Sequence, residues 1–212
     1  MALSKLAANS FDPTDNYALT GTVTGANSTQ KLFLIKNIDA SSSATISFVN
    51  GASSVVLDGT YKTYLFRYFN IHPATDTAYL SFQTSTNSGS SYGVTVTSSS
   101  FVTLHNEADN DTHLGYSTSR DLAQSTNFLA STDGYGNDND QCGAGELFLF
   151  NPSNTTFVKN WIWKDTAYNS NNFTTNSFNA GYFNTTSAIN AVQFKFSSGN
   201  IDSGRIALYG IK

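Results

Sequence analysis

The chain has 212 residues, of which 39% are hydrophobic, 14% are aromatic and only 12% are charged, and its net charge is −4. Globular chains usually carry about 25% charged residues, so the polar surface here must consist mainly of Ser, Thr, Asn and Gly, which argues against a free cytosolic enzyme. The eleven Lys and Arg form no run, which argues against binding of nucleic acid through a basic patch. Cys142 is the single cysteine, so no disulfide can form within the chain.

Residues 1–28 are expected to form an N-terminal arm that either reaches a neighbouring subunit or is a disordered tail, and residues 18–24 within it could form a short edge strand. Residues 1–10 lack the long apolar core of a signal peptide. No stretch approaches the roughly 20 apolar residues of a membrane span, so we expect a soluble protein without membrane insertion.

From Lys31 onward the sequence reads as strands. Residues 45–49 alternate between apolar and polar side chains, and Asn50-Gly51 follows them. Asn-Gly between apolar runs is a strong signal for a hairpin, so residues 54–57 are expected to be the partner strand.

Residues 61–71 carry aromatic rings at both odd and even positions, which is typical of a strand buried on both faces. We therefore expect this strand at the centre of a sheet. Pro73 cannot donate a ladder hydrogen bond and should end it. Residues 78–82 and 92–97 are expected to be further strands.

Residues 101–143 are polar and contain two acidic clusters, so we expect a long surface excursion between two groups of strands. Within it, residues 118–129 could form one or two helical turns, with Leu122 as the apolar contact. A loop of this length is usually functional or an interface.

Two strand predictions close the chain. Residues 157–163 should place Phe157, Trp161 and Trp163 on one face. Residues 189–212 read as a hairpin of two half-buried strands joined by a Ser-Gly turn. The expected fold is all-β: an antiparallel, jelly-roll-like sandwich of two sheets in a single domain that spans residues 29–212.

The second acidic cluster offers weak calcium ligands, namely Asp133, Asn137, Asp138 and Asp140. Calcium requires several oxygen ligands from a flexible loop, but the spacing here does not match an EF-hand. A solvated acidic loop is the simpler interpretation, and we expect no metal and no cofactor.

Signals for catalysis are weak. His105 and His113 are eight residues apart, which fits no zinc motif. The chain contains no Gly-x-Ser-x-Gly elbow, and nothing selects Glu107 and Glu146 as a pair of glycosidase carboxylates. His72 is expected to cap a turn or to pack against Tyr and Phe side chains. The sequence therefore favours a protein that is not an enzyme.

Sugar binding is a stronger alternative, because exposed rings stack on sugar faces. The candidates for glycan stacking are Trp161, Trp163, Tyr135 and Tyr168. The competing interpretation is that rings on strands belong to the core.

Several segments resemble virion-associated proteins of marine tailed bacteriophages. They are residues 1–6 (MALSKL), 10–12 (SFD), 69–76 (FNIHPATD), 136–142 (GNDNDQC), 150–159 (FNPSNTTFVK), 181–195 (GYFNTTSAINAVQFK) and 208–212 (LYGIK). The resemblance implies a structural protein on the particle exterior, as capsid decoration or as a part associated with the tail or a fibre, and it supplies no active-site residue. It implies assembly in the host cytoplasm, with other virion proteins and copies of itself as partners. The alternative is a β-sandwich that binds a host surface glycan.

Overall fold

A computed structural model describes residues 31–131 and 133–212. The arm expected at residues 1–28 lies outside these described residues. The strands are β1 Leu32–Asp39, β2 Ile46–Val49, β3 Thr63–Pro73, β4 Leu80–Ser85, β5 Val96–Asn106, β6 Thr112–Tyr116, β7 Leu129–Ala130, β8 Gly143–Phe150, β9 Lys159–Tyr168, β10 Phe173–Phe183, β11 Ala191–Phe196 and β12 Ile201–Ile211.

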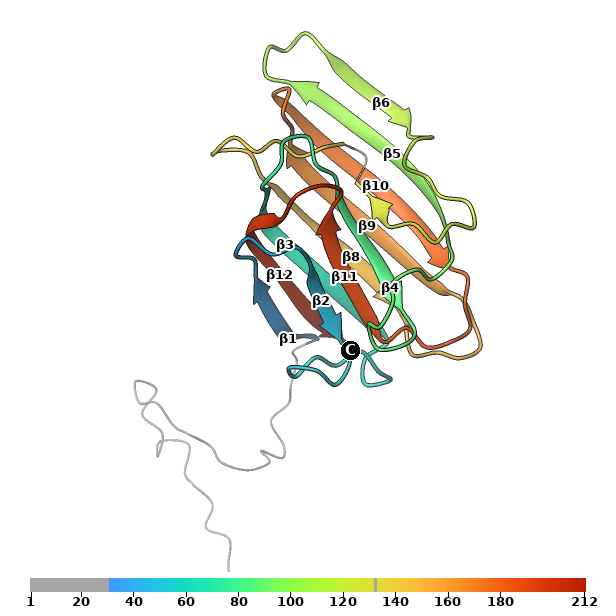
Figure 1. The fold of residues 1–212 in the computed structure, drawn as a ribbon. Coiled ribbons are helices and arrows are strands. Elements are labelled where there is room, and N and C mark those ends of the chain that lie inside the picture. The colour runs from blue at the N-terminus through green and yellow to red at the C-terminus, as the bar shows by residue number, and fades with distance from the viewer. Residues whose placement is uncertain (1–30, 132) are drawn as a thin grey trace, which may run out of the picture. The chain divides into compact units, whose positions relative to one another are not determined.

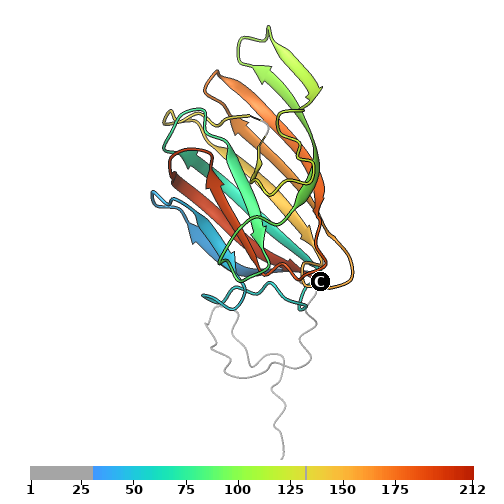
Figure 2. The same cartoon turned by 45° about the vertical axis from the view of Figure 1, so that its right-hand side comes forward.

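The strands form two antiparallel sheets that pack against each other (Figure 1). The large sheet has eight strands in the order β1-β12-β3-β8-β9-β10-β5-β6, and the small sheet has four in the order β2-β11-β4-β7. Figure 2 shows the two layers and the β5–β6 hairpin, which projects past the end of the small sheet. The prediction of an all-β antiparallel sandwich is confirmed, while its jelly-roll topology stays a prediction.

The core between the sheets consists largely of aromatic rings. From the large sheet, Trp161 and Trp163 point inward and are at most 1% exposed. Phe82 of the small sheet meets both indoles edge to face, with ring centroids 5.3 and 5.2 Å apart. Such edge-to-face contacts add to the free energy gained by burying the rings.

Strand β3 confirms the predicted central position in a sheet, but it is not buried on both faces, because Arg67 is exposed and Phe69 is 43% exposed. It pairs with β12 on one side and with β8 on the other, and it ends at Pro73. Its inward residues are Tyr64, Phe66 and Tyr68, all of which are buried.

The prediction that residues 189–212 form a hairpin is correct about the two strands and wrong about their pairing. The alternation is correct, because Phe194 and Leu208 are fully buried. However, β11 pairs with β2 and β4 in the small sheet, whereas β12 pairs with β1 and β3 in the large sheet. The Ser-Gly turn therefore carries the chain from one sheet to the other. Periodicity specifies which side of a strand is buried but not which strand is its neighbour.

The hairpin expected after β2 is also absent. Gly51 does turn the chain with a φ of +80°, but Ser53 and Ser54 adopt left-handed φ angles of 50° and 66°. These angles are incompatible with an extended partner strand. The segment instead curls back on itself through a hydrogen bond from the Gly51 amide to the Val55 carbonyl.

The region expected to be a surface excursion at residues 101–143 is partly sheet. Its start belongs to β5 and β6, and β7 joins the edge of the small sheet. The helical turns expected at 118–129 do not form, and the described residues contain no helix. Leu122 packs against the core as predicted.

Candidate functional site

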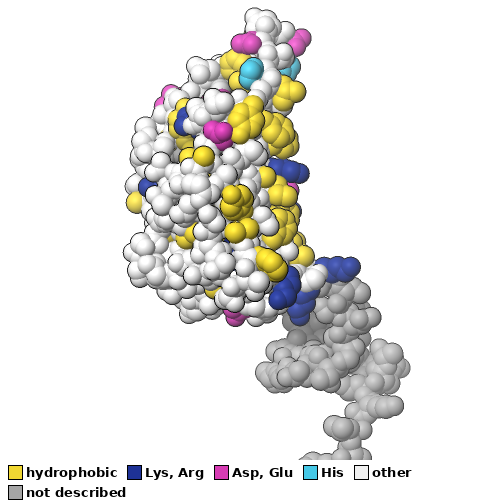
Figure 3. Space-filling model, turned by 90° about the vertical axis from the view of Figure 1, so that its right-hand side faces the viewer, with side chains coloured by type: hydrophobic (Ala, Val, Ile, Leu, Met, Phe, Trp, Pro, Cys, Tyr) yellow, Lys and Arg dark blue, Asp and Glu magenta, His cyan; other side chains and the backbone are white. Residues whose placement is uncertain are grey.

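The most distinctive surface is the outer face of the large sheet, which is the face turned away from the small sheet. Because side chains alternate along a strand, Trp161 and Trp163 point into the core while Ile162 and Lys164 point outward. Large hydrophobic side chains stay exposed on this face. They are Leu34, Phe69, Phe101, Leu114, Tyr116 and Ile162. Figure 3 shows hydrophobic side chains gathered along one side of the molecule, beside projecting Lys and Arg side chains.

Strand register aligns six outer side chains in a row across the sheet, each directly opposite the next. This cross-sheet row consists of Arg67, Glu146, Lys164, Phe178, Phe101 and Tyr116. Neighbouring strands lie about 4.8 Å apart, so the side chains of the row stand next to one another. Half of the row is charged and the other half is aromatic.

The aromatic half is a partly exposed platform. The rings of Phe101 and Phe178 are stacked, with centroids 4.9 Å apart and planes 8° from parallel. Tyr116 follows on β6 at 56% exposure, and its hydroxyl donates to Asp121 Oδ2 at 2.9 Å. The Asp121 carboxylate stabilises the protonated hydroxyl and thereby raises the pKa of Tyr116.

The charged half lines a cavity of about 470 Å³, together with Phe69, Phe178 and Asn176. Arg67 Nη2 lies 3.6 Å from Glu146 Oε2, and both side chains are partly exposed, so this ion pair stabilises the fold little. Lys164 is exposed and lies directly opposite Glu146. We call this the Lys164 cavity. It joins ring faces to charged groups that could orient a polar ligand.

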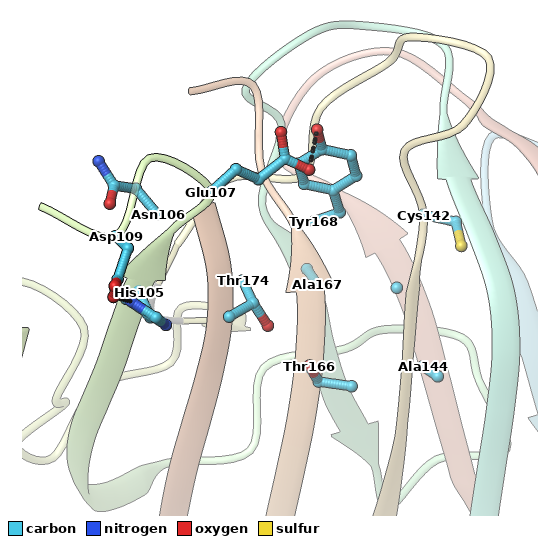
Figure 4. A pocket seen from close by; sticks show the side chains of 11 residues that line it. His105, Asn106, Glu107, Asp109, Cys142, Ala144, Thr166, Ala167, Tyr168 and Thr174 are labelled. Atoms are coloured by element: carbon cyan, nitrogen blue, oxygen red, sulfur yellow. Dashed lines mark hydrogen bonds and ion pairs between the residues drawn. The ribbon is translucent and has the colours of Figure 1, made fainter. Parts of the chain in front are cut away.

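A second cavity, of about 580 Å³, lies farther along the same face (Figure 4). Tyr168 Oη donates to Glu107 Oε1 at 3.1 Å. Partial burial raises the pKa of Tyr168, and the Glu107 carboxylate raises it further. Among the predicted glycan-stacking residues, Tyr168 is the one that lines a cavity, which we call the Tyr168 cavity.

The Tyr168 cavity does not assemble a catalytic pair. His105 Nε2 lies 3.0 Å from Asp109 Oδ1, but both side chains are largely exposed. Figure 4 places Cys142 on the opposite side of the cavity from His105, so no thiol–imidazole pair forms. His113 lies on the other face of the hairpin, because its register partner is Leu104 whereas that of His105 is Thr112. The two histidines therefore do not share a metal site.

The calcium candidates do not gather around one point, and the hydrogen bonds that Asn137 and Asp138 donate come from their backbone N–H groups. Asp133 Oδ2 accepts from Asn169 Nδ2 at 2.7 Å. The Asp138 amide donates to Gln141 Oε1 at 3.1 Å, and the Asn137 amide donates to Asp76 at 3.3 Å. Asp140 is exposed. Over residues 31–131 and 133–212, no three His, Cys, Asp or Glu side chains gather to hold a metal ion.

Three of the four predicted glycan-stacking residues are core residues instead. Trp161, Trp163 and Tyr135 are at most 1% exposed and cannot stack on a sugar. Trp163 Nε1 also donates to Tyr68 Oη at 2.8 Å. Phe157 was expected on the same face as Trp161 and Trp163, but this prediction is wrong, because Phe157 precedes β9 and is 70% exposed.

Sequence reasoning missed a buried carboxyl group. Asp165 is 5% exposed, on the same inward face of β9 as Trp163. Tyr135 Oη donates to Asp165 Oδ2 at 2.5 Å. Burial raises the pKa of Asp165 to about 6, although hydrogen bonds from Tyr135 and Ser177 oppose the shift. The alternation of β9 could have identified it, since Asp165 is two residues beyond Trp163.

Comparison of the chain with protein families, with curated proteins and with solved structures finds no match. Within the described part of the chain, no helix is long and apolar enough to cross a membrane.

Proposed function

We propose that the chain is a non-enzymatic structural component of a tailed-phage virion, displayed on the particle exterior as capsid decoration or as a protein associated with the tail or a fibre. The observation that carries the proposal is the apolar outer face of the large sheet. The sequence resemblance to virion-associated proteins of marine tailed phages supports it independently.

The physical reason lies in the exposed area. An isolated apolar side chain in water is ordinary, but a contiguous group on one sheet face marks an interaction surface. Leu114 is 72% exposed and Phe101 is 44% exposed, and both lie on the outer face of the β5–β6 hairpin. Burying such side chains against a neighbouring subunit contributes roughly 25 cal/mol per Å² of apolar surface. A chain with 12% charged residues suits a protein that is held in an assembly.

The test is fractionation of purified particles. The protein should copurify with virions, and the double substitution Phe101→Ser with Leu114→Ser should reduce its incorporation several-fold. Lys195→Ala is the matched control, because Lys195 lies on β11 of the small sheet. Abundance in infected cells combined with absence from particles would refute the proposal.

The Lys164 cavity favours a second candidate function, which is recognition of a host surface glycan. A sugar could place its apolar face on Phe69 or Phe178 and its hydroxyls near Glu146 and Asn176, all of which line this cavity. Titration of the purified protein with neutral and acidic oligosaccharides tests this function. Phe178→Ala and Lys164→Ala should each weaken binding, and equal binding by wild type and both variants would exclude this cavity as the site.

A further inference from the structure

The two edges of the large sheet are built differently. Edge strand β1 has a bulge between Leu34 and Lys36, and its last residue, Asp39, is paired with Arg205 at 2.5 and 2.8 Å. Bulges and charged side chains are the usual means by which sheet edges avoid pairing with other chains. Edge strand β6 has the sequence Thr-His-Leu-Gly-Tyr, without Lys, Arg, Asp, Glu or Pro, and it pairs with β5 without a register shift.

Hydrogen bonding shows which backbone groups of β6 face outward. The Asn106 amide donates to the Asp111 carbonyl at 3.2 Å, and the Ser117 amide donates to the Ser100 carbonyl at 2.8 Å. In an antiparallel pair, hydrogen-bonded and non-hydrogen-bonded residue pairs alternate. Asp111 and Ser117 both bond to β5, so the alternation between them implies that the backbone groups of His113 and Gly115 also bond to β5. The amide and carbonyl groups of Thr112, Leu114 and Tyr116 therefore point to the free edge, where the side chains of these three residues are also exposed.

We propose that this edge pairs with the same edge of a second copy, antiparallel and around a two-fold axis at Leu114. Leu114 then lies opposite Leu114 of the other copy, and Thr112 lies opposite Tyr116. These residues exchange the backbone hydrogen bonds that they lack at a free edge. The proposal goes beyond the virion assignment and does not depend on it.

The side chains fit this symmetric register. On the outer face, the small Thr112 lies opposite the large Tyr116, and the two leucines meet at the axis. On the other face, His113 lies opposite Gly115, where the imidazole of the same copy already covers the glycine, because a Cβ at Gly115 would lie 2.5 Å from His113 Nε2. A self-complementary contact of this kind produces a closed dimer, the commonest form of soluble oligomer.

The pairing also joins the two outer faces. A two-fold axis perpendicular to the sheet keeps the outer faces of both copies on the same side. Because Tyr116 lies opposite Thr112, the platforms of Phe178, Phe101 and Tyr116 in the two copies would be offset along the strands and joined through the two Leu114 side chains at the axis. The dimer would present one apolar surface that spans both large sheets, and this doubles the area offered to any further partner.

Light scattering after size exclusion, over a dilution series of the full chain, tests the proposal. Wild type should be a dimer that dissociates on dilution. Leu114→Lys should be monomeric at every concentration, because one substitution places two ammonium groups opposite each other at the axis. Leu34→Lys is the matched control, since Leu34 is an exposed leucine on β1 that faces the same side, and it should stay dimeric.

A cross-link keeps the test informative if Leu114→Lys fails to fold. Hydrogen-bonded antiparallel pairs have Cα atoms about 5.5 Å apart, which lies within the range of a disulfide. In a Cys142→Ser background, Leu114→Cys should form an intermolecular disulfide under mild oxidation, whereas Leu34→Cys should not. A monomeric wild type, or a dimer that neither Leu114→Lys nor the cysteine pair affects, would overturn the proposal.

Discussion

The two faces of the large sheet both carry aromatic rings, but for different physical reasons. On the inner face, Trp161 and Trp163 are at most 1% exposed and pack against rings of the small sheet. On the outer face, Phe101 and Tyr116 remain about half exposed and stand in a row across the strands. Alternation divides the side chains of a strand into two sets, one on each face. The set that the second sheet covers becomes the core.

The largest expected loss of stability comes from a substitution on the inner face. Trp163→Ala should lower the free energy of unfolding by about 3–5 kcal/mol, because it leaves a cavity and removes the donor to Tyr68. Chemical denaturation monitored by circular dichroism measures this change. Ile162→Ala, one residue away on the outer face, is the control and should cost less than about 1 kcal/mol. Similar losses in both variants would contradict the assignment of the two faces.

The second effect is a pH dependence that originates at Asp165. Its carboxyl pKa is raised from 3.8 to about 6 by burial, so the folded state holds the proton more tightly than the unfolded state does. This contribution to stability is fully present below the unfolded pKa and is lost as the pH rises through about 6. A shift of this size corresponds to about 3 kcal/mol.

Asp165→Asn should therefore flatten the decline in unfolding free energy between about pH 4 and about pH 7, as measured by denaturation at a series of pH values. Asp140→Asn is the control, because Asp140 is exposed and should keep the wild-type profile. If Asp165→Asn retained the full decline, another group would be responsible.

Much of the fold follows from local sequence patterns. The alternation in residues 191–196 correctly identifies a strand and its buried side. The rings of residues 63–69 correctly identify a central strand, but the burial expected on both of its faces holds only for the inner face. Strand partners do not follow, because β11 and β12 are consecutive in the chain yet belong to different sheets. A short turn can join neighbours in one sheet or cross between two sheets, and the residues of the turn do not distinguish the two outcomes.

The candidate site was harder to predict for the same reason. The cross-sheet row combines residues from six strands, and its members meet only through the order β3-β8-β9-β10-β5-β6. No local pattern relates Arg67 to Lys164. Tyr168 was named as an aromatic ring that could stack on a sugar, but the same criterion also selected Trp161 and Trp163, which the small sheet covers.

A smaller effect concerns the glycines of β8, which lie beneath core tyrosines. An added Cβ at Gly145 would meet Tyr68 Oη at 2.5 Å and would also collide with the Lys164 carbonyl. Gly145→Ala should cost about 1–3 kcal/mol through overpacking. Ala144→Ser, on the outer face, should be nearly neutral. Thermal denaturation of both variants compares them, and a neutral Gly145→Ala would show that both the Tyr68 ring and the Lys164 carbonyl can shift to admit the methyl group.

The smallest effect on stability is expected on the outer face itself. Ile162 is 40% exposed and lies opposite Phe148 and Ala180, so Ile162→Thr keeps a β-branched side chain and should change the unfolding free energy by no more than about 0.5 kcal/mol. If this face is an assembly surface, the same substitution should still reduce incorporation into particles, because its apolar area is then buried against a partner. An unchanged level of incorporation would place the docking surface elsewhere on the molecule. A large loss of stability would instead show that the outer face is packed within the monomer, and the contrast between the two faces would no longer hold.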